Sequence, residues 1–155
     1  MMPRAVLALG ACMIFLAAGG LVGGVALVVD PSGALLGLPA SFLHRLPVAT
    51  YLLPGWFILL VYGVVPLIIV YRFRRRAKHV LDRGRGLGEM RSWLWVSAVL
   101  LSVVLIVWML VQLALIGLRM PLQVVMLVLG LAMLALALSP STRRYFTIAR
   151  DAPVR

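Results

Sequence analysis

The sequence has few charged residues and few of the side chains that carry most enzyme chemistry. Only 12% of its 155 residues are charged, whereas 64% are hydrophobic. Acidic residues number four, histidines two and cysteines one. So few charges leave no polar shell around a soluble core of this size. The composition therefore excludes a soluble monomer, indicates an integral membrane protein, and makes an enzyme, a cofactor site or a metal site unexpected.

The single cysteine, Cys12, excludes an internal disulfide and paired-cysteine redox chemistry within the chain. It follows Leu9-Gly10-Ala11, an arrangement similar to a lipoprotein signal, but a long apolar stretch continues after it, so we do not favour lipidation. That first apolar run is also longer than the 7–15 residues of a signal-peptide core and lacks a clear cleavage site. We expect it to remain in the membrane as a helix.

Four uncharged apolar runs are long enough to cross about 30 Å of hydrocarbon at about 1.5 Å per helical residue. Such runs must be helical in lipid, because only a helix pairs its own backbone groups there. Pro54 and Pro121 suit the first turn of a helix, where the missing N–H is not needed. The sequence therefore predicts one all-α membrane domain, 1–155, an antiparallel four-helix bundle with spans at 5–29, 54–71, 92–118 and 121–138.

The distribution of Lys and Arg predicts the orientation of these spans. Thirteen of the 15 basic residues fall before the first span, between the second and third, or after the fourth, whereas only Arg45 and Arg119 fall on the other side. Basic residues accumulate on the cytoplasmic side. We expect both termini to be cytoplasmic, with an outer loop at 30–53, a basic cytoplasmic loop at 72–91 and a cytoplasmic tail at 139–155.

A net charge of +11 is typical of nucleic-acid binders, but here the predicted topology accounts for it and we expect no nucleic acid as a partner. The densest basic run follows the second span. We interpret it as a stop-transfer segment that contacts anionic lipid headgroups on the cytoplasmic side, and specific binding of an anionic lipid or an acidic partner is the alternative. The candidate headgroup contacts are Arg72, Arg74, Arg75, Arg76 and Lys78.

Glycines recur at four-residue spacing in the first span, at Gly19 and Gly23 and at Gly20 and Gly24. Such a stripe lets another helix backbone approach closely, which is how helices associate in lipid. We interpret these four glycines as a helix-packing seam. The sequence leaves open whether the seam meets a helix of the same chain, a second copy in a homo-oligomer, or another subunit of a larger membrane complex.

Few polar side chains lie inside the predicted spans. Trp108 and Gln112 are four residues apart and share a helix face, while Tyr62 and Gln123 fall in the outer halves of their own helices. We expect these four residues to form an intramembrane polar patch, which either joins helices by hydrogen bonds or lines a small neutral cavity. Pro66 removes a helix N–H and should bend the second span, a feature that is either structural or part of a binding site.

The outer loop begins with Asp30-Pro31-Ser32-Gly33, the composition of a type I turn. Residues 39–46 have the pattern of about two helical turns lying in the membrane interface. Asp30 and His44 are the candidate acid–base pair on this side, but we interpret Asp30 as a turn residue and His44 as an interfacial side chain. One His and one Asp are too few to ligate a metal.

The outer-loop strings DPSG, LGLP and LLPG, with WxxxQ in the third span and Pro-Leu-Gln at the start of the fourth, resemble a group of small uncharacterised four-helix bacterial membrane proteins. The resemblance covers most of the chain, although its motifs are short. It implies the four-helix fold and a bacterial inner membrane, and it implies no activity. Independently, 14 of the 15 basic residues are Arg, which suits a bacterial genome rich in G and C.

Three functions remain open at this point. The favoured one is a non-enzymatic protein that works by association, as a homo-oligomer or as an accessory subunit. The alternative is an oligomeric permease or channel for a small neutral or anionic solute, because no acidic residue lies within the spans for coupling to protons or cations. A lipid-active enzyme using Asp30 and His44 is the weakest hypothesis.

Overall fold

The computed structural model describes residues 3–39, 49–79, 87–118 and 120–147, and within these ranges it gives only the backbone of 73–79, 87–92 and 144–147. The described residues form helices joined by turns, with no strand among them. Four helical segments are long and apolar enough to cross a membrane, namely Arg4–Val29, Leu52–Arg72, Trp93–Ile116 and Pro121–Leu138. The prediction of an all-α protein with four such helices is therefore confirmed.

The second span is built from three consecutive helical elements, whereas the other spans each lie in one helix. Helix α1 covers Arg4–Val29, and a short 3-10 turn, η1, follows at Ala34–Leu36. The second span contains α2 at Leu52–Phe57, the π-helix η3 at Ile58–Val64 and α3 at Val65–His79. The chain continues as α4 at Leu87–Ile116, α5 at Pro121–Leu138 and α6 at Pro140–Thr147.

The observed helix ends coincide with the predicted span ends at residues 29, 121 and 138, lie within two residues of them at 4, 52 and 116, and differ more at 79 and 87. Helix α5 begins at Pro121 as expected, and Pro54 lies in the first turn of α2. Helix α4 ends two residues earlier than predicted because Gly117 takes a positive φ of 78° and its N–H bonds to the carbonyl of Leu113. The segment 72–91, predicted as a loop, is helical at 72–79 and 87–91, consistent with the high helix propensity of Arg and Lys.

The expected disturbance before Pro66 takes the form of the π-helix η3. The ring of Pro66 removes the N–H that would bond to the carbonyl of Tyr62 in an α-helix. In the preceding residues the hydrogen bonds widen to five-residue spacing, as in the bond from the Val65 N–H to the Leu60 carbonyl. This winding also brings Phe57 and Tyr62, five residues apart, into an edge-to-face contact with ring centroids 5.5 Å apart.

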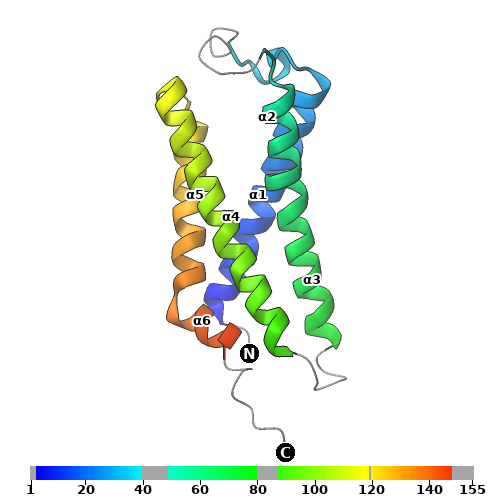
Figure 1. Ribbon diagram of the computed structural model, residues 1–155, viewed down its shortest axis with the longest axis vertical. Coiled ribbons are helices and arrows are strands. Elements are labelled where there is room, and N and C mark those ends of the chain that lie inside the picture. The colour runs from blue at the N-terminus through cyan, green and yellow to red at the C-terminus, as the bar shows by residue number, and fades with distance from the viewer. Residues whose placement is uncertain (1–2, 40–48, 80–86, 119, 148–155) are drawn as a thin grey trace, which may run out of the picture.

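The helices pack as two pairs, which are α1 with the second span and α4 with α5. Helix α1 lies along α2, η3 and α3, while α4 lies along α5, and contacts from α1 to α5 and from α3 to α4 connect the pairs. Figure 1 shows the end of α1, the start of α2, the end of α4 and the start of α5 at one end of the molecule, with α6 at the other. The main core lies between the pairs, and its most buried large side chains include Leu16, Leu105 and Met133.

Helix α6 lies in a segment that the sequence analysis treated as a simple tail, so that description was incomplete. The hydroxyl oxygen of Ser139 accepts a bond from the Thr142 N–H at 3.3 Å, which caps the helix. The indole N–H of Trp95 in α4 donates to the carbonyl of Ala137 at 2.8 Å, and the guanidinium of Arg143 lies 5.7 Å from the centre of the Trp95 ring. Trp95 therefore holds the junction of α5 and α6 against α4.

The turn after α1 forms as the sequence predicts. The Gly33 N–H bonds to the Asp30 carbonyl at 3.1 Å. The Asp30 carboxylate accepts bonds from the Ser32 hydroxyl at 2.6 Å, the Ser32 N–H at 3.1 Å and the Leu35 N–H at 2.8 Å. The Ser32 hydroxyl and then the Leu35 N–H lower the pKa of this carboxyl below its usual value. The helical turns expected within 39–46, and His44 with them, fall almost wholly outside the described residues.

Candidate functional site

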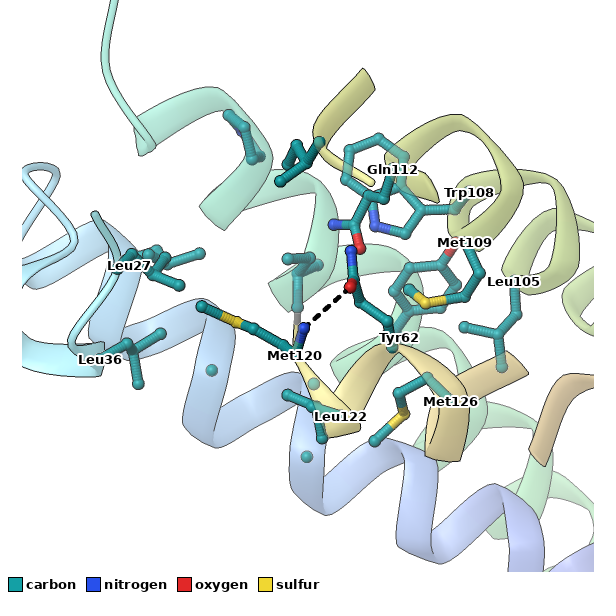
Figure 2. Close-up of a pocket in the computed structure, with 18 of the residues that line it drawn as sticks. Leu27, Leu36, Tyr62, Leu105, Trp108, Met109, Gln112, Met120, Leu122 and Met126 are labelled. Carbon is teal, nitrogen blue, oxygen red and sulfur yellow. Dashed lines mark hydrogen bonds between the residues drawn. The ribbon is translucent and has the colours of Figure 1, made fainter. Parts of the chain in front are cut away.

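A cavity of about 390 Å³ lies between the two helix pairs, at the end of the molecule where α1 joins α2. Its walls come from α1, α2, η3, α4 and α5, and residues of the segment between α1 and α2, such as Leu36 and Tyr51, cover one end. The cavity is partly open to the exterior of the bundle. Figure 2 shows Leu27 and Leu36 toward one side of it and Leu105 and Met126 toward the other.

All four residues of the expected polar patch line this cavity: Tyr62 from η3, Trp108 and Gln112 from α4, and Gln123 from α5. Figure 2 shows Gln112 and Trp108 side by side above Tyr62, as their four-residue spacing on α4 requires. The structure thus brings together residues from three helices that are far apart in the sequence.

Tyr62 and Gln123 both make hydrogen bonds, of two different kinds. The Tyr62 hydroxyl donates to the carbonyl of Val104 at 3.1 Å, and this bond joins η3 to α4 across the core. Gln123 instead caps its own helix, because its side-chain oxygen accepts the Met120 N–H at 3.2 Å. Tyr62 therefore holds helices together, whereas the Met120–Gln123 bond fixes the start of α5 at the mouth of the cavity.

Phe57, which the sequence analysis did not single out, completes an aromatic group with Tyr62 and Trp108. Its ring lies 4.5 Å from the Trp108 ring, centroid to centroid, at 33°. The indole nitrogen of Trp108 is buried without a hydrogen-bond partner, the one such side-chain atom among the residues that the structure describes. The signal that could have identified Phe57 is the spacing of five residues to Tyr62 just before a helix proline, which becomes a shared face only in π-helical winding.

The four glycines of the predicted packing seam divide between two roles. A Cβ at Gly20 would lie 2.6 Å from both the Tyr62 carbonyl oxygen and the Gly63 nitrogen, and one at Gly24 would lie 2.6 Å from the backbone of Leu59. These two positions bring α1 against η3 of the same chain. A Cβ at Gly23 would meet nothing within 4 Å, and one at Gly19 would meet only the end of Met126 at 3.8 Å. Gly19 and Gly23 instead leave open space along the wall of the cavity.

The candidate headgroup contacts lie far from the cavity in the sequence and at the opposite end of the second span. Arg72 is exposed at the end of the apolar segment. Arg74, Arg75, Arg76 and Lys78 continue α3, and their side chains fall outside what the structure describes. The two groups of candidate residues therefore belong to separate regions of the molecule.

The chemistry that the cavity offers is that of a binding site for an apolar molecule. Its lining is almost entirely apolar, with the amides of Gln112 and Gln123 as its main polar groups. Pockets of this kind bind ligands by apolar burial and orient them with a few polar groups. Among the described residues, no three His, Cys, Asp or Glu side chains gather as a metal site would need, and Cys12 is a free thiol. No family model, curated protein or solved structure matches this chain.

Proposed function

We propose that the chain is an antiparallel four-helix bundle in a bacterial inner membrane with both termini in the cytoplasm. The bias of 13 basic residues against two supports this orientation. The aromatic residues support the placement of the spans, since exposed Trp56 and Trp93 each fall near the first residue of their span, where indole rings favour the membrane interface. The arrangement places the cavity in the outer half of the membrane and α6 on the cytoplasmic side.

Cysteine labelling tests this orientation. In a Cys12→Ser background, Ala34→Cys lies in the exposed turn before α2, and Ser141→Cys lies on the exposed side of α6. A membrane-impermeant maleimide added to intact cells should label position 34 and should reach position 141 only after the membrane is opened. The reverse pattern would overturn the orientation.

Within this membrane we propose a non-enzymatic role in association, as an accessory subunit of a larger membrane complex or as a homo-oligomer. The observation that carries the proposal is the exposure of α5. Only 17% of its apolar 18-residue window is buried within the chain, compared with 39% for α1. Val124, Val128 and Leu131 are each 44% exposed or more. The outer face of α5, the least buried of the four spans, is thus an apolar surface available to a partner helix.

The surface proposed for association differs from the one that the glycine pattern alone suggests. Gly20 and Gly24 are already used by η3 of the same chain. They leave no room for a helix of another chain at the same place. A partner would therefore approach α5 from outside the bundle.

Mass measurement of the intact particle tests the proposal. The protein is extracted gently at its natural expression level, with a photo-crosslinking amino acid at Val128 on α5 or, as the matched control, at Val107 on α4, which is similarly exposed. We expect a particle heavier than one 16.9 kDa chain and a crosslink from position 128 that position 107 does not give. A monomeric particle without a crosslink from Val128 would overturn it.

A second candidate is favoured by the cavity itself, namely an oligomeric permease or channel for a small neutral or anionic solute. Gln112 and Gln123 would supply the polar contacts. The inner end of the cavity argues against a path through one chain. Its deepest lining residues are at most 3% exposed, namely Leu16, Tyr62 and Leu105. If the chain is a permease, Gln112→Leu should change a measured solute flux, and an unchanged flux would eliminate this pathway.

The basic residues after the second span are proposed to contact anionic headgroups on the cytoplasmic side. Arg72, Arg74, Arg75, Arg76 and Lys78 follow one another within one helix, at the end of an apolar segment. Replacing all five by Gln should weaken the preference of the reconstituted protein for phosphatidylglycerol over phosphatidylcholine vesicles. Added salt should weaken the preference of the unmodified protein in the same way. An unchanged preference would contradict this role.

A further inference from the structure

We propose that the cavity binds one acyl chain of a phospholipid from the outer leaflet. The proposal rests on the membrane arrangement given above and needs no particular partner on α5. Protein interiors are close-packed, so an apolar void of about 390 Å³ between packed helices forfeits many contacts if it stays empty. Water gains little there, because apolar cavities of this kind stay dry. Lipid chains are the apolar molecules that surround the protein.

The length of the cavity matches the hydrocarbon of one leaflet. Its lining runs from Leu16 to Leu27 on α1 and from Leu105 to Ile116 on α4, so that eleven helical rises separate the first and last lining residue on each helix. At about 1.5 Å per residue this is about 16 Å. A hydrocarbon core about 30 Å thick gives each leaflet about half of that. The cavity therefore extends from the membrane surface to the middle of the bilayer, as one lipid tail does.

The width of the cavity favours a chain over a helix. A volume of about 390 Å³ spread over that length forms a slot narrower than an α-helix, which is about 10–12 Å across with its side chains. Part of the slot is the space that side chains at Gly19 and Gly23 would occupy. A Cβ at either position would enter open space without overlapping a neighbour. A flexible hydrocarbon chain can follow such a slot, whereas a helix of a second copy cannot enter it.

The polar groups of the lining lie at the level of a lipid's ester groups. Gln112 is about 6 Å along α4 from Ile116, and Gln123 is about 3 Å along α5 from Pro121. The remaining two thirds of the slot, toward Leu16 and Leu105, is apolar except for the Tyr62 hydroxyl, which is bonded to the Val104 carbonyl, and the buried indole N–H of Trp108. The cavity thus has its amides near the surface and is mainly apolar in depth, which is the polarity of a phospholipid entering from the outer side.

Filling the slot with a side chain tests the proposal. Gly23→Leu places an isobutyl group where a Cβ meets nothing, inside the cavity. Gly10→Leu adds the same group at another open position of the same helix, outside the cavity, and is the matched control. Each protein is reconstituted in vesicles of phosphatidylethanolamine and phosphatidylglycerol, extracted and delipidated identically, and its retained lipids are counted by native mass spectrometry.

We expect one phospholipid per chain to survive delipidation in the unmodified protein and in Gly10→Leu. Occupancy should fall about tenfold in Gly23→Leu, the change that a loss of about 1.4 kcal/mol in binding produces. Circular dichroism and gel filtration check that all three proteins are folded. If Gly23→Leu does not fold, Gly19→Leu fills the same slot from the neighbouring position.

Three results would overturn the proposal. The first is equal retention in Gly23→Leu and Gly10→Leu, and the second is the absence of a retained phospholipid, or retention of detergent or a free fatty acid in its place. The third is a dimer that Gly23→Leu dissociates, which would mean that a second copy fills the slot. A missing partner on α5 leaves these lipid counts unchanged, so failure of the proposed association is distinguishable from failure of the lipid site.

Discussion

Gly20 lies against the backbone of Tyr62 so closely that a Cβ on Gly20 would be 2.6 Å from the Tyr62 carbonyl oxygen. Real Cβ atoms do not approach a backbone atom so closely, so only glycine permits this crossing of α1 and η3. The same approach brings Tyr62 to the depth at which its hydroxyl reaches Val104 on α4. One glycine thereby sets the position of a side chain that joins three of the spans.

Replacing the close-packed glycines should destabilise the fold, whereas replacing the open ones should not. Gly20→Ala and Gly24→Ala force α1 away from η3 and should each cost about 1–3 kcal/mol of unfolding free energy, as overpacking does. Gly10→Ala and Gly23→Ala meet open space and should cost nothing. Unfolding in a denaturing-detergent titration measures the difference. Equal losses at all four positions would contradict the assignment of the contact.

Removing the Tyr62 hydroxyl should have a small effect. Tyr62→Phe keeps the ring contact with Phe57 and loses only the bond to the Val104 carbonyl, a loss of about 1 kcal/mol or less for a bond between membrane helices. Tyr62→Ala also removes a ring that is 97% buried and should cost about 3–5 kcal/mol. Comparison of the two unfolding free energies checks the prediction, and similar losses would mean that the hydroxyl, not the ring, dominates.

The turn after α1 should respond to acid. Because hydrogen bonds from Ser32 and Leu35 favour the carboxylate, the pKa of Asp30 is lower in the folded protein than the usual value of about 3.9. Its contribution to stability is therefore present above pH 4 and is lost as the pH falls through the lowered pKa. Side-chain carbon NMR across this range measures the pKa directly. Ser32→Ala should raise it, and an unchanged value would show that the hydroxyl bond contributes nothing.

The attachment of α6 should depend on Trp95. Trp95→Phe loses the bond to the Ala137 carbonyl and part of the stack with Arg143, a loss of about 1 kcal/mol. Backbone hydrogen exchange in Pro140–Thr147 should then quicken about fivefold. The matched control is Trp93→Phe, because Trp93 is 73% exposed. Equal exchange in the two variants would contradict the role given to Trp95.

The sequence predicted what depends on a single helix and left open what depends on how helices meet. Apolar run length and the two prolines were enough for the number of spans and for the start of α5. Helix α6 was missed because its basic residues suggested a tail, although Ser139 followed by Pro140 is a recognisable N-terminal helix signal.

The candidate site shows the same division between local and tertiary information. The shared face of Trp108 and Gln112 follows from their spacing alone. The division of the glycines does not, because Gly20 and Gly19 are adjacent in the sequence and both line the cavity, yet only Gly20 lies against the backbone of η3. That difference depends on which face of α1 meets η3, which no local pattern encodes. Phe57 was missed for a related reason, since its contact with Tyr62 needs the π-helical winding.

The π-helix at Ile58–Val64 has a consequence for how the chain tolerates a change in its length. Five-residue hydrogen-bond spacing accommodates one residue more than an α-helix would hold over the same rise. Deleting one residue there can be absorbed by a return to α-helical winding, with the helices on either side keeping their faces. The same deletion in the middle of α4 would rotate everything beyond it by about 100° and turn Gln112 away from its neighbours. Among the four spans, η3 is thus the segment that can lose one residue without rotating the helices on either side of it.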